Sequence, residues 1–207
     1  MNRKFDQDFW EQLWSKTLRE HPDKVARRPP NVHLMAELAE LPPARALDAG
    51  CGHGADALWL AVRGWRVTAV DFSESALDQG RAMAAAAGGS VVQPIEWIRG
   101  DLATWPVEPG LYELVVCLYV HVAGSVEEMV KRMAHGVAPG GTLFLVGHRP
   151  IDPSTGVATA AANQQQISVE SAITALDVAH WELIVAEERP RSVAGSGVDA
   201  VIRARRR

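Results

Sequence analysis

The most specific spacing in the chain belongs to one acid and three glycines in the stretch LDAGCGHGADALWLA, namely Asp48, Gly50, Gly52 and Gly54. An apolar strand-like run precedes the glycines and a helix-like run follows them, so they are expected at a strand-to-helix junction. Glycine lets the backbone turn sharply there and approach a ligand. The start of the helix adds unpaired N–H groups and a partial positive charge. This stretch predicts a site for a small, partly anionic ligand.

Two further acids come at the ends of the next strand-like runs. Asp71 ends WRVTAVD, 21 residues after Gly50, where a carboxylate can accept hydrogen bonds from both hydroxyls of a ribose. Asp101, in RGDLATW, is placed to accept a hydrogen bond from the exocyclic amine of adenine, with Leu102 and Phe72 on the two faces of the ring. A single acid at a strand end is as often a cap or a solvated charge. Three in succession predict an adenosine-type cofactor.

Two classes of cofactor satisfy these features. The string from Gly50 to Ala55 fits the loose G-x-G-x-x-G/A pattern of dinucleotide binding, which keeps a nicotinamide-dependent oxidoreductase open as an alternative. Asp48 favours the other class, because a carboxylate two residues before the first glycine would repel a pyrophosphate across a poorly solvated gap. The ammonium and sulfonium groups of S-adenosylmethionine are cationic and would be attracted. We therefore expect S-adenosylmethionine as cofactor and S-adenosylhomocysteine as product.

The motif of residues 48–54 occurs together with Val70-Asp71-Phe72-Ser73, Gly100-Asp101-Leu102 and a Pro139-Gly140-Gly141 break. In this combination the chain resembles the class I S-adenosylmethionine-dependent methyltransferases over roughly Leu34 to Val146. It is most similar to the small bacterial single-domain enzymes of the tellurite-resistance and thiopurine methyltransferase type. These share a Trp-rich N-terminal helix and a Pro-Asn step like Pro30-Asn31.

The resemblance assigns residues to each part of the cofactor. It implies that Asp48 and Gly50 lie near the methionine part, Asp71 at the ribose, Asp101 and Leu102 at the adenine, and Cys117 beside the cofactor through its backbone. Cys51, Gly52, Phe72 and Ser73 belong to the same motifs and complete the expected cofactor-binding set. No residue is expected to bind a metal.

Apolar runs alternate with helix-like runs from Leu47 onward, which predicts βαβαβ units with parallel strands and helices on both faces of a sheet. Strands are expected at residues 44–50, 65–71, 95–102, 112–120 and 142–147, the last of them after the Pro-Gly-Gly break. Helices are expected near residues 54–64, 73–89, 126–137 and 169–176. The runs WELIVAEE and VDAVIRA predict an edge hairpin. The expected fold class is a three-layer, Rossmann-like α/β fold, and the resemblance implies a seven-stranded, mostly parallel sheet.

The first 43 residues lie outside this alternation and are expected to form a helical cap (1–43) on a methyltransferase domain (44–207), within one compact domain. A first helix is indicated by apolar residues at helical spacing: Phe5, Phe9, Trp10, Leu13 and Trp14. A second is expected from Asn31, as its N-cap, to Leu41. Trp10, Trp14 and Asn31 are candidates to shape the substrate pocket, although plain packing is the simpler role for Trp10. The turn-rich stretch from His148 to Ile167 is a candidate lid.

Three residues near the ends of the fourth and fifth strands are candidate catalytic residues on the side of the methyl acceptor: Tyr119, His121 and His148. Methyl transfer is an in-line displacement in which alignment and exclusion of water supply much of the rate. A base is therefore needed only when the acceptor arrives protonated. His121 has a side chain suited to proton removal near neutral pH, but a hydrogen bond at a helix start explains it as well. Packing for Tyr119 and a surface position for His148 are equally open.

Composition narrows the function further. The net charge of −4 gives no general attraction for a polyanion, so nucleic acid is not an expected partner, and no apolar run reaches the ~18 residues of a membrane span. Cys51 and Cys117 form neither a zinc spacing nor a disulfide framework, which fits a cytoplasmic protein. We expect a methyltransferase that acts on a small molecule at O, N, S or a metalloid. A catalytically silent S-adenosylmethionine-binding module is the alternative of another class, and the acceptor and the oligomeric state are not predicted.

Overall fold

The computed structural model describes residues 7–88, 93–121, 124–151, 156–157, 165–191 and 197–207. It divides into two compact units, Met1–Pro106 and Val107–Arg207. Phe5, part of the first predicted helix, lies outside the described residues. The same holds for residues 152–155 and 158–164 of the candidate lid.

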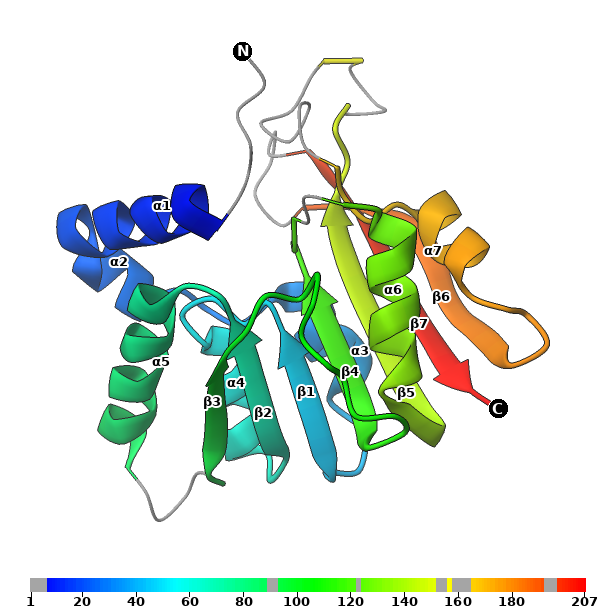
Figure 1. The fold of residues 1–207 in the computed structure, drawn as a ribbon, viewed down its shortest axis with the longest axis horizontal. Coiled ribbons are helices and arrows are strands. Elements are labelled where there is room, and N and C mark those ends of the chain that lie inside the picture. Colours follow the sequence, from blue (N-terminus) through cyan, green and yellow to red (C-terminus); the bar gives the residue numbers. More distant parts are fainter. Residues whose placement is uncertain (1–6, 89–92, 122–123, 152–155, 158–164, 192–196) are drawn as a thin grey trace. The chain divides into compact units, whose positions relative to one another are not determined.

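The first unit is built on three parallel strands, β1 (Arg45–Ala49), β2 (Arg66–Asp71) and β3 (Ile95–Arg99). Helix α4 (Ala55–Val62) connects β1 to β2, and α5 (Glu74–Ala87) connects β2 to β3. The two helices contact each other and the strands, and α4 lies behind the strands in Figure 1. These are the predicted βαβαβ elements, and they bring the ends of β1 and β2 to the same edge, because parallel strands end on the same side of a sheet.

Within the described part of the segment before β1 there are three helices, where two were predicted: α1 (Gln7–Glu20), α2 (Pro22–Ala26) and α3 (Val32–Leu38). The unpredicted α2 begins at Pro22, whose ring favours the first position of a helix. The start of α3 is as predicted, since the side-chain oxygen of Asn31 accepts hydrogen bonds from the N–H groups of His33 at 2.9 Å and Leu34 at 3.1 Å. The helix ends at Leu38 rather than at Leu41.

The second unit contains β4 (Tyr112–Leu118), α6 (Val126–His135), β5 (Val137–His148), α7 (Val169–Ala175), β6 (Trp181–Pro190) and β7 (Val198–Arg206). Strands β4 and β5 are parallel, and β6 and β7 form the predicted antiparallel hairpin. The second strand of the hairpin, β7, lies beside β5 and runs antiparallel to it. Its register places Asp199 opposite His148.

One expected boundary was wrong. The residues Pro139-Gly140-Gly141 were expected to separate a helix from a strand at 142–147, but β5 begins at Val137 and contains all three. The strand tolerates them because its pairing with β4 shifts register between Tyr112 and Leu114, and Gly140 takes a positive φ of 78°. The Pro-Gly-Gly signal therefore marks an irregularity of the bulge type inside the strand and not a break before it.

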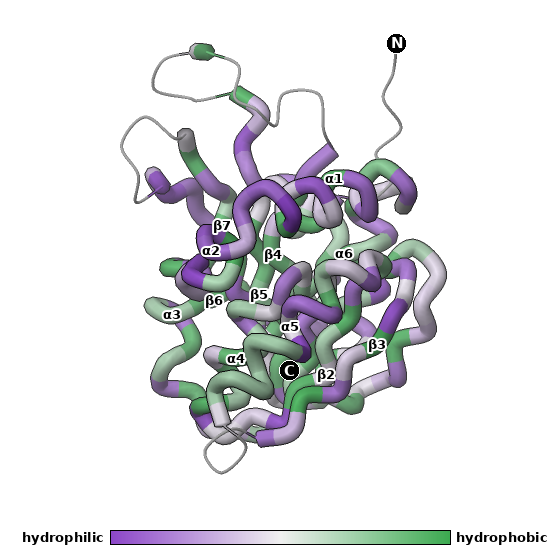
Figure 2. The backbone as a smooth tube through the Cα atoms, turned by 90° about the vertical axis from the view of Figure 1, so that its left-hand side faces the viewer, coloured by the Kyte–Doolittle hydropathy of each residue, from purple (hydrophilic) through white to green (hydrophobic). Residues whose placement is uncertain are grey.

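The strands form a seven-stranded sheet in the order β3-β2-β1-β4-β5-β7-β6. This confirms the predicted Rossmann-like α/β fold class with an edge hairpin. Strands β1, β4 and β5 are buried along most of their length, which explains their continuous apolar runs. Figure 2 shows β4 and β5 in hydrophobic colours and α1 and α2 largely in hydrophilic ones. Within the described residues, no helix combines the length and the apolar character that crossing a membrane requires.

Gly147 in β5 tests how closely the second unit is packed. A Cβ at this position would lie 2.1 Å from the carbonyl oxygen of Ile167, which is backbone and cannot rotate away. We expect Gly147→Ala to lower the free energy of unfolding by about 1–3 kcal/mol, as overpacking does, in urea unfolding followed by circular dichroism. Gly124→Ala is the control, because no described atom lies within 4 Å of a Cβ there. Equal stability of the two variants would contradict this prediction.

Candidate functional site

The glycine-rich turn joins β1 to α4. Gly50, Gly52 and Gly54 have positive φ values of 80°, 52° and 79°, a conformation that residues with side chains rarely adopt. The N–H groups of Gly50 and Cys51 both donate to the carbonyl oxygen of Val70, at 2.8 and 3.1 Å. The turn is thereby tied to the neighbouring strand β2, and only glycines can make it without strain.

Asp71 is a buried carboxylate at the end of β2. One oxygen accepts a hydrogen bond from the N–H of Gly52 at 2.8 Å, and the other accepts one from the N–H of Ser73 at 2.9 Å. Burial raises the pKa of Asp71, and the hydrogen bonds from Ser73 and Gly52 oppose that shift. Each oxygen of a carboxylate has a second lone pair. Asp71 can therefore hold the turn and still accept hydrogen bonds from a ligand.

Asp48, in β1, has fewer hydrogen-bond partners than Asp71. The residue is 2% exposed, and among the described residues its Oδ2 has no hydrogen-bond partner. Burial raises the pKa of Asp48 well above its usual value, and the charges of Asp56 and Asp71 raise it further. A buried carboxyl group beside two other acids is costly unless it is protonated or compensated by a cation. The turn of the first unit thus provides a buried position that favours positive charge.

Asp101 and Leu102 lie in a turn that follows β3. Asp101 is exposed and its Oδ1 accepts a hydrogen bond from the N–H of Ala103 at 2.9 Å, while Leu102 is buried. The preceding Gly100 donates its N–H to the carbonyl oxygen of Asp71 at 3.0 Å. The backbone before the Asp101 turn is therefore fastened to the residue at the end of β2.

The other predicted cofactor residues have structural contacts of their own. Ser73 caps α5 by accepting a hydrogen bond from the N–H of Ala76 at 3.2 Å, and Phe72 is half-buried beside it. Cys51 is buried, and burial raises the pKa of its thiol well above the usual value. The sulfur of Cys117, in β4, lies 3.7 Å from the sulfur of Met129. Both thiols are thus enclosed by the protein, which is typical of packing groups.

Helix α1 packs on the glycine turn through Trp14. A Cβ added to Gly52 would lie 2.9 Å from the Trp14 ring, and the ring centre lies 5.6 Å from that of His53. Trp10 makes an edge contact with Phe9, with ring centres 5.3 Å apart. Trp14, one of the two tryptophans expected to shape the substrate pocket, therefore contacts the glycine turn.

Two sets of hydrogen bonds fasten the N-terminal helices. The carboxylate of Glu11 in α1 accepts hydrogen bonds from the hydroxyls of Ser75 and Ser15. The N–H of Asn31 donates to Oδ1 of Asp56 at 2.7 Å, while its side chain caps α3. The backbone and side chain of Asn31 thus connect α3 to α4. The structure therefore shows Asn31 as a residue that positions these two helices.

The second unit gathers a separate polar cluster around Asp199, from the ends of β4 and β5, the start of β7 and the residue after β6. The hydroxyl of Tyr119 donates to Oδ2 of Asp199 at 2.8 Å, and Nε of Arg191 donates to Oδ1 at 2.8 Å. Nδ1 of His148 lies 3.0 Å from the same Oδ1. The Tyr119 and His148 rings stack with centres 4.0 Å apart. Two of the three predicted catalytic residues therefore meet at one buried carboxylate.

His121, the third predicted catalytic residue, belongs to the same neighbourhood through Gln166. Nε2 of Gln166 lies 3.0 Å from Nδ1 of His121, and Oε1 of Gln166 accepts a hydrogen bond from the backbone N–H of His148 at 3.1 Å. Burial lowers the pKa of His121 to about 4, and the nearby His148 contributes to that shift. His121 is therefore neutral at physiological pH.

Sequence reasoning missed three members of this cluster, Asp199, Arg191 and Gln166. Gln166 stands in a polar run that was assigned to a lid, and Arg191 in a polar connection between two strands. Asp199 had a usable signal, because it is the one acid in the apolar strand VDAVIRA. A carboxylate in a buried strand requires partners, and the partners reach it only through the fold.

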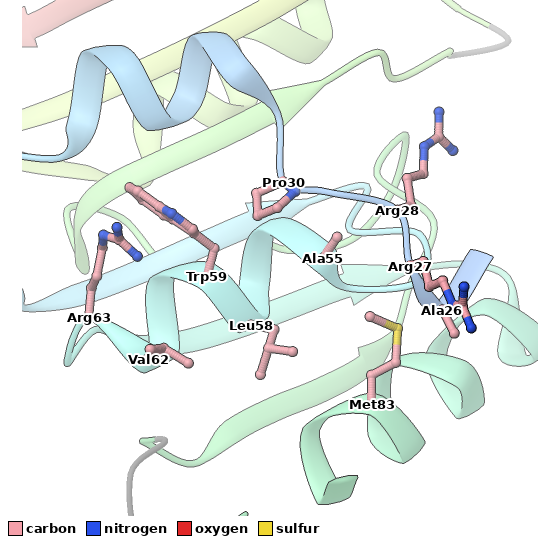
Figure 3. Close-up of a pocket in the computed structure, with 10 residues that line it drawn as sticks. All are labelled: Ala26, Arg27, Arg28, Pro30, Ala55, Leu58, Trp59, Val62, Arg63 and Met83. Atoms are coloured by element: carbon pink, nitrogen blue, oxygen red, sulfur yellow. The ribbon is translucent and has the colours of Figure 1, made fainter. Parts of the chain in front are cut away.

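A separate pocket of about 330 Å³ lies in the first unit against α4 and contains none of the predicted site residues (Figure 3). Its lining includes Arg27, Arg28 and Arg63, whose side chains point in different directions in Figure 3. Arg63 stacks on Trp59 at 3.9 Å from the ring centre. This pocket does not focus charge on a ligand. Among the described residues, no three His, Cys, Asp or Glu side chains gather as metal ligands.

Comparison with known proteins finds a methyltransferase domain. Residues 46–141 match a family model described as a methyltransferase domain. The chain is 31% identical over 138 residues to trans-aconitate 2-methyltransferase of Paracidovorax citrulli. The aligned region covers 64% of this chain and 49% of that protein. The chain spans about half the length of the curated relatives it matches.

Solved structures share the fold. The N-methyltransferase NodS from Bradyrhizobium japonicum WM9, in complex with S-adenosylhomocysteine, superposes with a TM-score of 0.70 at 19% identity and covers 95% of this chain and 97% of that chain. TehB from Haemophilus influenzae gives a TM-score of 0.70 at 15% identity, over 92% and 66% of the two chains. The match to a methyltransferase domain and the shared fold are those expected of a class I S-adenosylmethionine-dependent methyltransferase. These findings favour this class over the oxidoreductase that the glycine pattern left open.

The buried His53 and the half-buried His121 give a prediction for nuclear magnetic resonance. Burial lowers the pKa of both His53 and His121 to about 4, so we expect their ring C–H signals to stay those of neutral imidazole until the pH falls well below 6. In the urea-unfolded chain both should titrate near the ordinary histidine value of about 6.5. Variants His53→Gln and His121→Gln assign the signals. Titration near 6.5 in the folded protein would contradict this environment.

Proposed function

We propose that this protein transfers the methyl group of S-adenosylmethionine to a small molecule by direct in-line displacement. The observation that carries the proposal is the buried carboxyl group of Asp48, whose Oδ2 has no hydrogen-bond partner among the residues that the structure describes. A cation there would compensate its charge, whereas a pyrophosphate would add to the negative charge of Asp48, Asp56 and Asp71. The match of residues 46–141 to a methyltransferase domain supports the same assignment.

The residues of the first unit fit the parts of this cofactor. We assign Asp48 and the backbone of Gly50, Cys51 and Gly52 to the methionine part, Asp71 with Phe72 and Ser73 to the ribose, and Asp101 with Leu102 to the adenine. The bound cofactor supplies a methyl group made electrophilic by a positively charged sulfur. The protein binds and aligns the acceptor and excludes water, which supplies much of the rate in such a displacement.

The acceptor is proposed to be small and at least partly apolar, and Tyr119, His121 and His148 are assigned to its side of the reaction. The relative named for trans-aconitate supports a small acceptor, and the net charge of −4 argues against a nucleic acid. We further propose a cytoplasmic location and a capping role for residues 1–43 on a domain of residues 44–207. The contact of Trp14 with the glycine turn supports that role.

The variant Asp48→Asn separates ligand binding from stability. It removes the buried charge and keeps the shape, so we expect a more stable ligand-free protein and about 10- to 100-fold weaker binding of S-adenosylhomocysteine, the worth of one hydrogen bond to a charged group. Because folding raises the pKa of Asp48 above 3.8, its contribution to stability is present below that pH and is lost as the pH rises. The stability gain of the variant should therefore grow with pH in thermal unfolding, and calorimetry measures the affinity.

A ligand without the amino-acid part provides the control for this measurement. The affinity for 5′-methylthioadenosine should be unchanged in Asp48→Asn and reduced in Asp71→Asn, because Asp71 is assigned to the ribose and Asp48 to the methionine part that this ligand lacks. Asp78→Asn, which alters an exposed acid paired with Arg81 in α5, should bind both ligands as the unaltered protein does. If the unaltered protein bound no S-adenosylhomocysteine and instead enhanced the fluorescence of NADH, the oxidoreductase reading would replace this one.

Methyl transfer itself is tested with methyl-labelled S-adenosylmethionine and a panel of phenols, alcohols, thiols, amines, carboxylates and tellurite. We expect labelled product from at least one class of small acceptor, and none after removal of the acceptor. The cofactor-binding module predicts instead that S-adenosylhomocysteine binds while no acceptor is labelled. Calorimetry and product analysis on the same preparation distinguish the two readings.

A further inference from the structure

The cluster around Asp199 has the connections of an oriented base. Asp199 is 1% exposed, yet its carboxylate receives donors at both oxygens: the Tyr119 hydroxyl at Oδ2, and Arg191 and His148 at Oδ1. The ion pair with Arg191 and the hydrogen bond from Tyr119 stabilise the charged carboxylate. A buried carboxylate that is held in this way presents a fixed negative charge to the imidazole of His148.

The position of the proton on His148 follows from what surrounds Nδ1. Asp199 Oδ1 lies 3.0 Å from it, and Nη2 of Arg191 also approaches it closely. Nδ1 cannot donate to the carboxylate and accept from the guanidinium at the same time. Asp199 is buried within a strand, whereas the side chain of Arg191 is 23% exposed and can turn Nη2 toward water. Asp199, the partner that cannot move, therefore determines the tautomer of His148, in which Nδ1–H donates a hydrogen bond to Asp199.

This tautomer leaves the lone pair on Nε2. The side-chain hydrogen bonds of His148 are made by Nδ1, and the side chain is 27% exposed. Its ring is held by the stacked Tyr119 on one face and its backbone by Gln166. His148 thus has a fixed orientation, a defined protonation site and an accessible lone pair, which is the arrangement of a general base.

We propose that His148 is the general base of the methyl transfer, that Asp199 is its positioning residue, and that the acceptor is a hydroxyl group of an alcohol or a phenol. This inference rests on the proposed function. An alcohol or phenol arrives protonated near neutral pH, since a phenol such as the tyrosine side chain has a pKa of about 10. Carboxylates are already ionised there and would need no base.

The step balances without any further reactant. The acceptor oxygen forms the new bond to the methyl carbon while the bond from that carbon to sulfur breaks, and the electron pair of the broken bond stays on sulfur. The proton of the hydroxyl passes to Nε2 of His148. The products are a methyl ether, neutral S-adenosylhomocysteine and an imidazolium whose charge is stabilised by Asp199. The imidazolium then releases its proton to water.

His121 fits this role less well than His148. Both of its ring nitrogens are close to Nε2 of Gln166, at 3.0 and 3.4 Å, and its depressed pKa of about 4 makes it a weak proton acceptor at neutral pH. Its contact with Gln166, which also holds the backbone of His148, instead links it to the positioning of the base. The assignment of His148 rather than His121 as the base thus rests on the hydrogen-bond partners of the two side chains.

The tautomer is tested without any acceptor by imidazole proton–nitrogen spectra of the nitrogen-15-labelled protein at neutral pH, with His148→Gln to assign the signals. We expect His148 to carry its proton on Nδ1 and to have an unprotonated Nε2. In Asp199→Asn the amide N–H can donate to Nδ1, so the proton should move to Nε2. A proton on Nε2 in the unaltered protein would overturn the proposal, and so would an unchanged tautomer in a folded Asp199→Asn variant.

The role in catalysis is tested with a series of substituted phenols whose pKa values run from about 7 to about 10. We expect His148→Gln to reduce methylation of the weakly acidic phenols by about 10²-fold or more, and to affect little those that are ionised in the assay. His180→Gln is the matched control, because His180 pairs through Nδ1 with Asp177 at 2.8 Å on an exposed surface. This variant should leave all rates unchanged.

Two results would overturn the proposal even if methyl transfer were established. One is an equal loss for acidic and weakly acidic phenols in His148→Gln, and the other is an unaltered protein that methylates carboxylates or thiols but no hydroxyl group. Both leave the binding of S-adenosylhomocysteine intact in calorimetry. Loss of that binding in the unaltered protein would instead contradict the proposed function itself, so the two failures are distinguishable.

Discussion

The first unit depends on the two hydrogen bonds that the Asp71 carboxylate accepts from the backbone. One comes from Gly52 in the turn after β1 and the other from Ser73 at the start of α5, so one side chain joins the loops that follow two neighbouring strands. Burying a carboxylate is unfavourable by itself, and these donors offset that penalty. The same acid is then held rigidly at the edge of the sheet, where a ribose is proposed to bind. The fold and the proposed binding site therefore share one interaction.

The second unit uses a buried carboxylate in a different way. Asp199 comes from a strand and not from a loop, and the antiparallel register of β5 and β7 places it opposite His148. The aromatic ring of Tyr119, which has a positive φ of 55°, stacks on that histidine. The positive φ is uncommon for a residue with a side chain and is often found at functional sites. Here it occurs at a residue whose hydroxyl hydrogen-bonds Asp199.

The sequence predicted those features that depend only on residues close together in the chain. The Asn31 cap, the glycine turn and the acid at the end of β2 each depend on a few neighbouring residues, and all were read from the sequence. The partnership of His148 with Asp199 was not, because it depends on which strand of the hairpin lies beside β5 and in which register, and packing over long sequence distances decides both. The predicted start of β5 after Pro139-Gly140-Gly141 was wrong for the same reason, because only the pairing with β4 shows that the strand continues through these residues.

The two kinds of buried acid explain why similar side chains serve different tasks. Asp48 retains an oxygen without a partner among the described residues, so its burial lowers stability until a cation arrives, and the relief of that penalty adds to affinity for a positively charged ligand. Asp199 has donors at both oxygens, so it has little to gain from a ligand and instead orients the group that touches it. A buried carboxylate that lacks partners favours binding, whereas one that is fully partnered favours positioning. On this basis we assign the acids of the first unit to the proposed cofactor site, and the acid of the second unit to the proposed base.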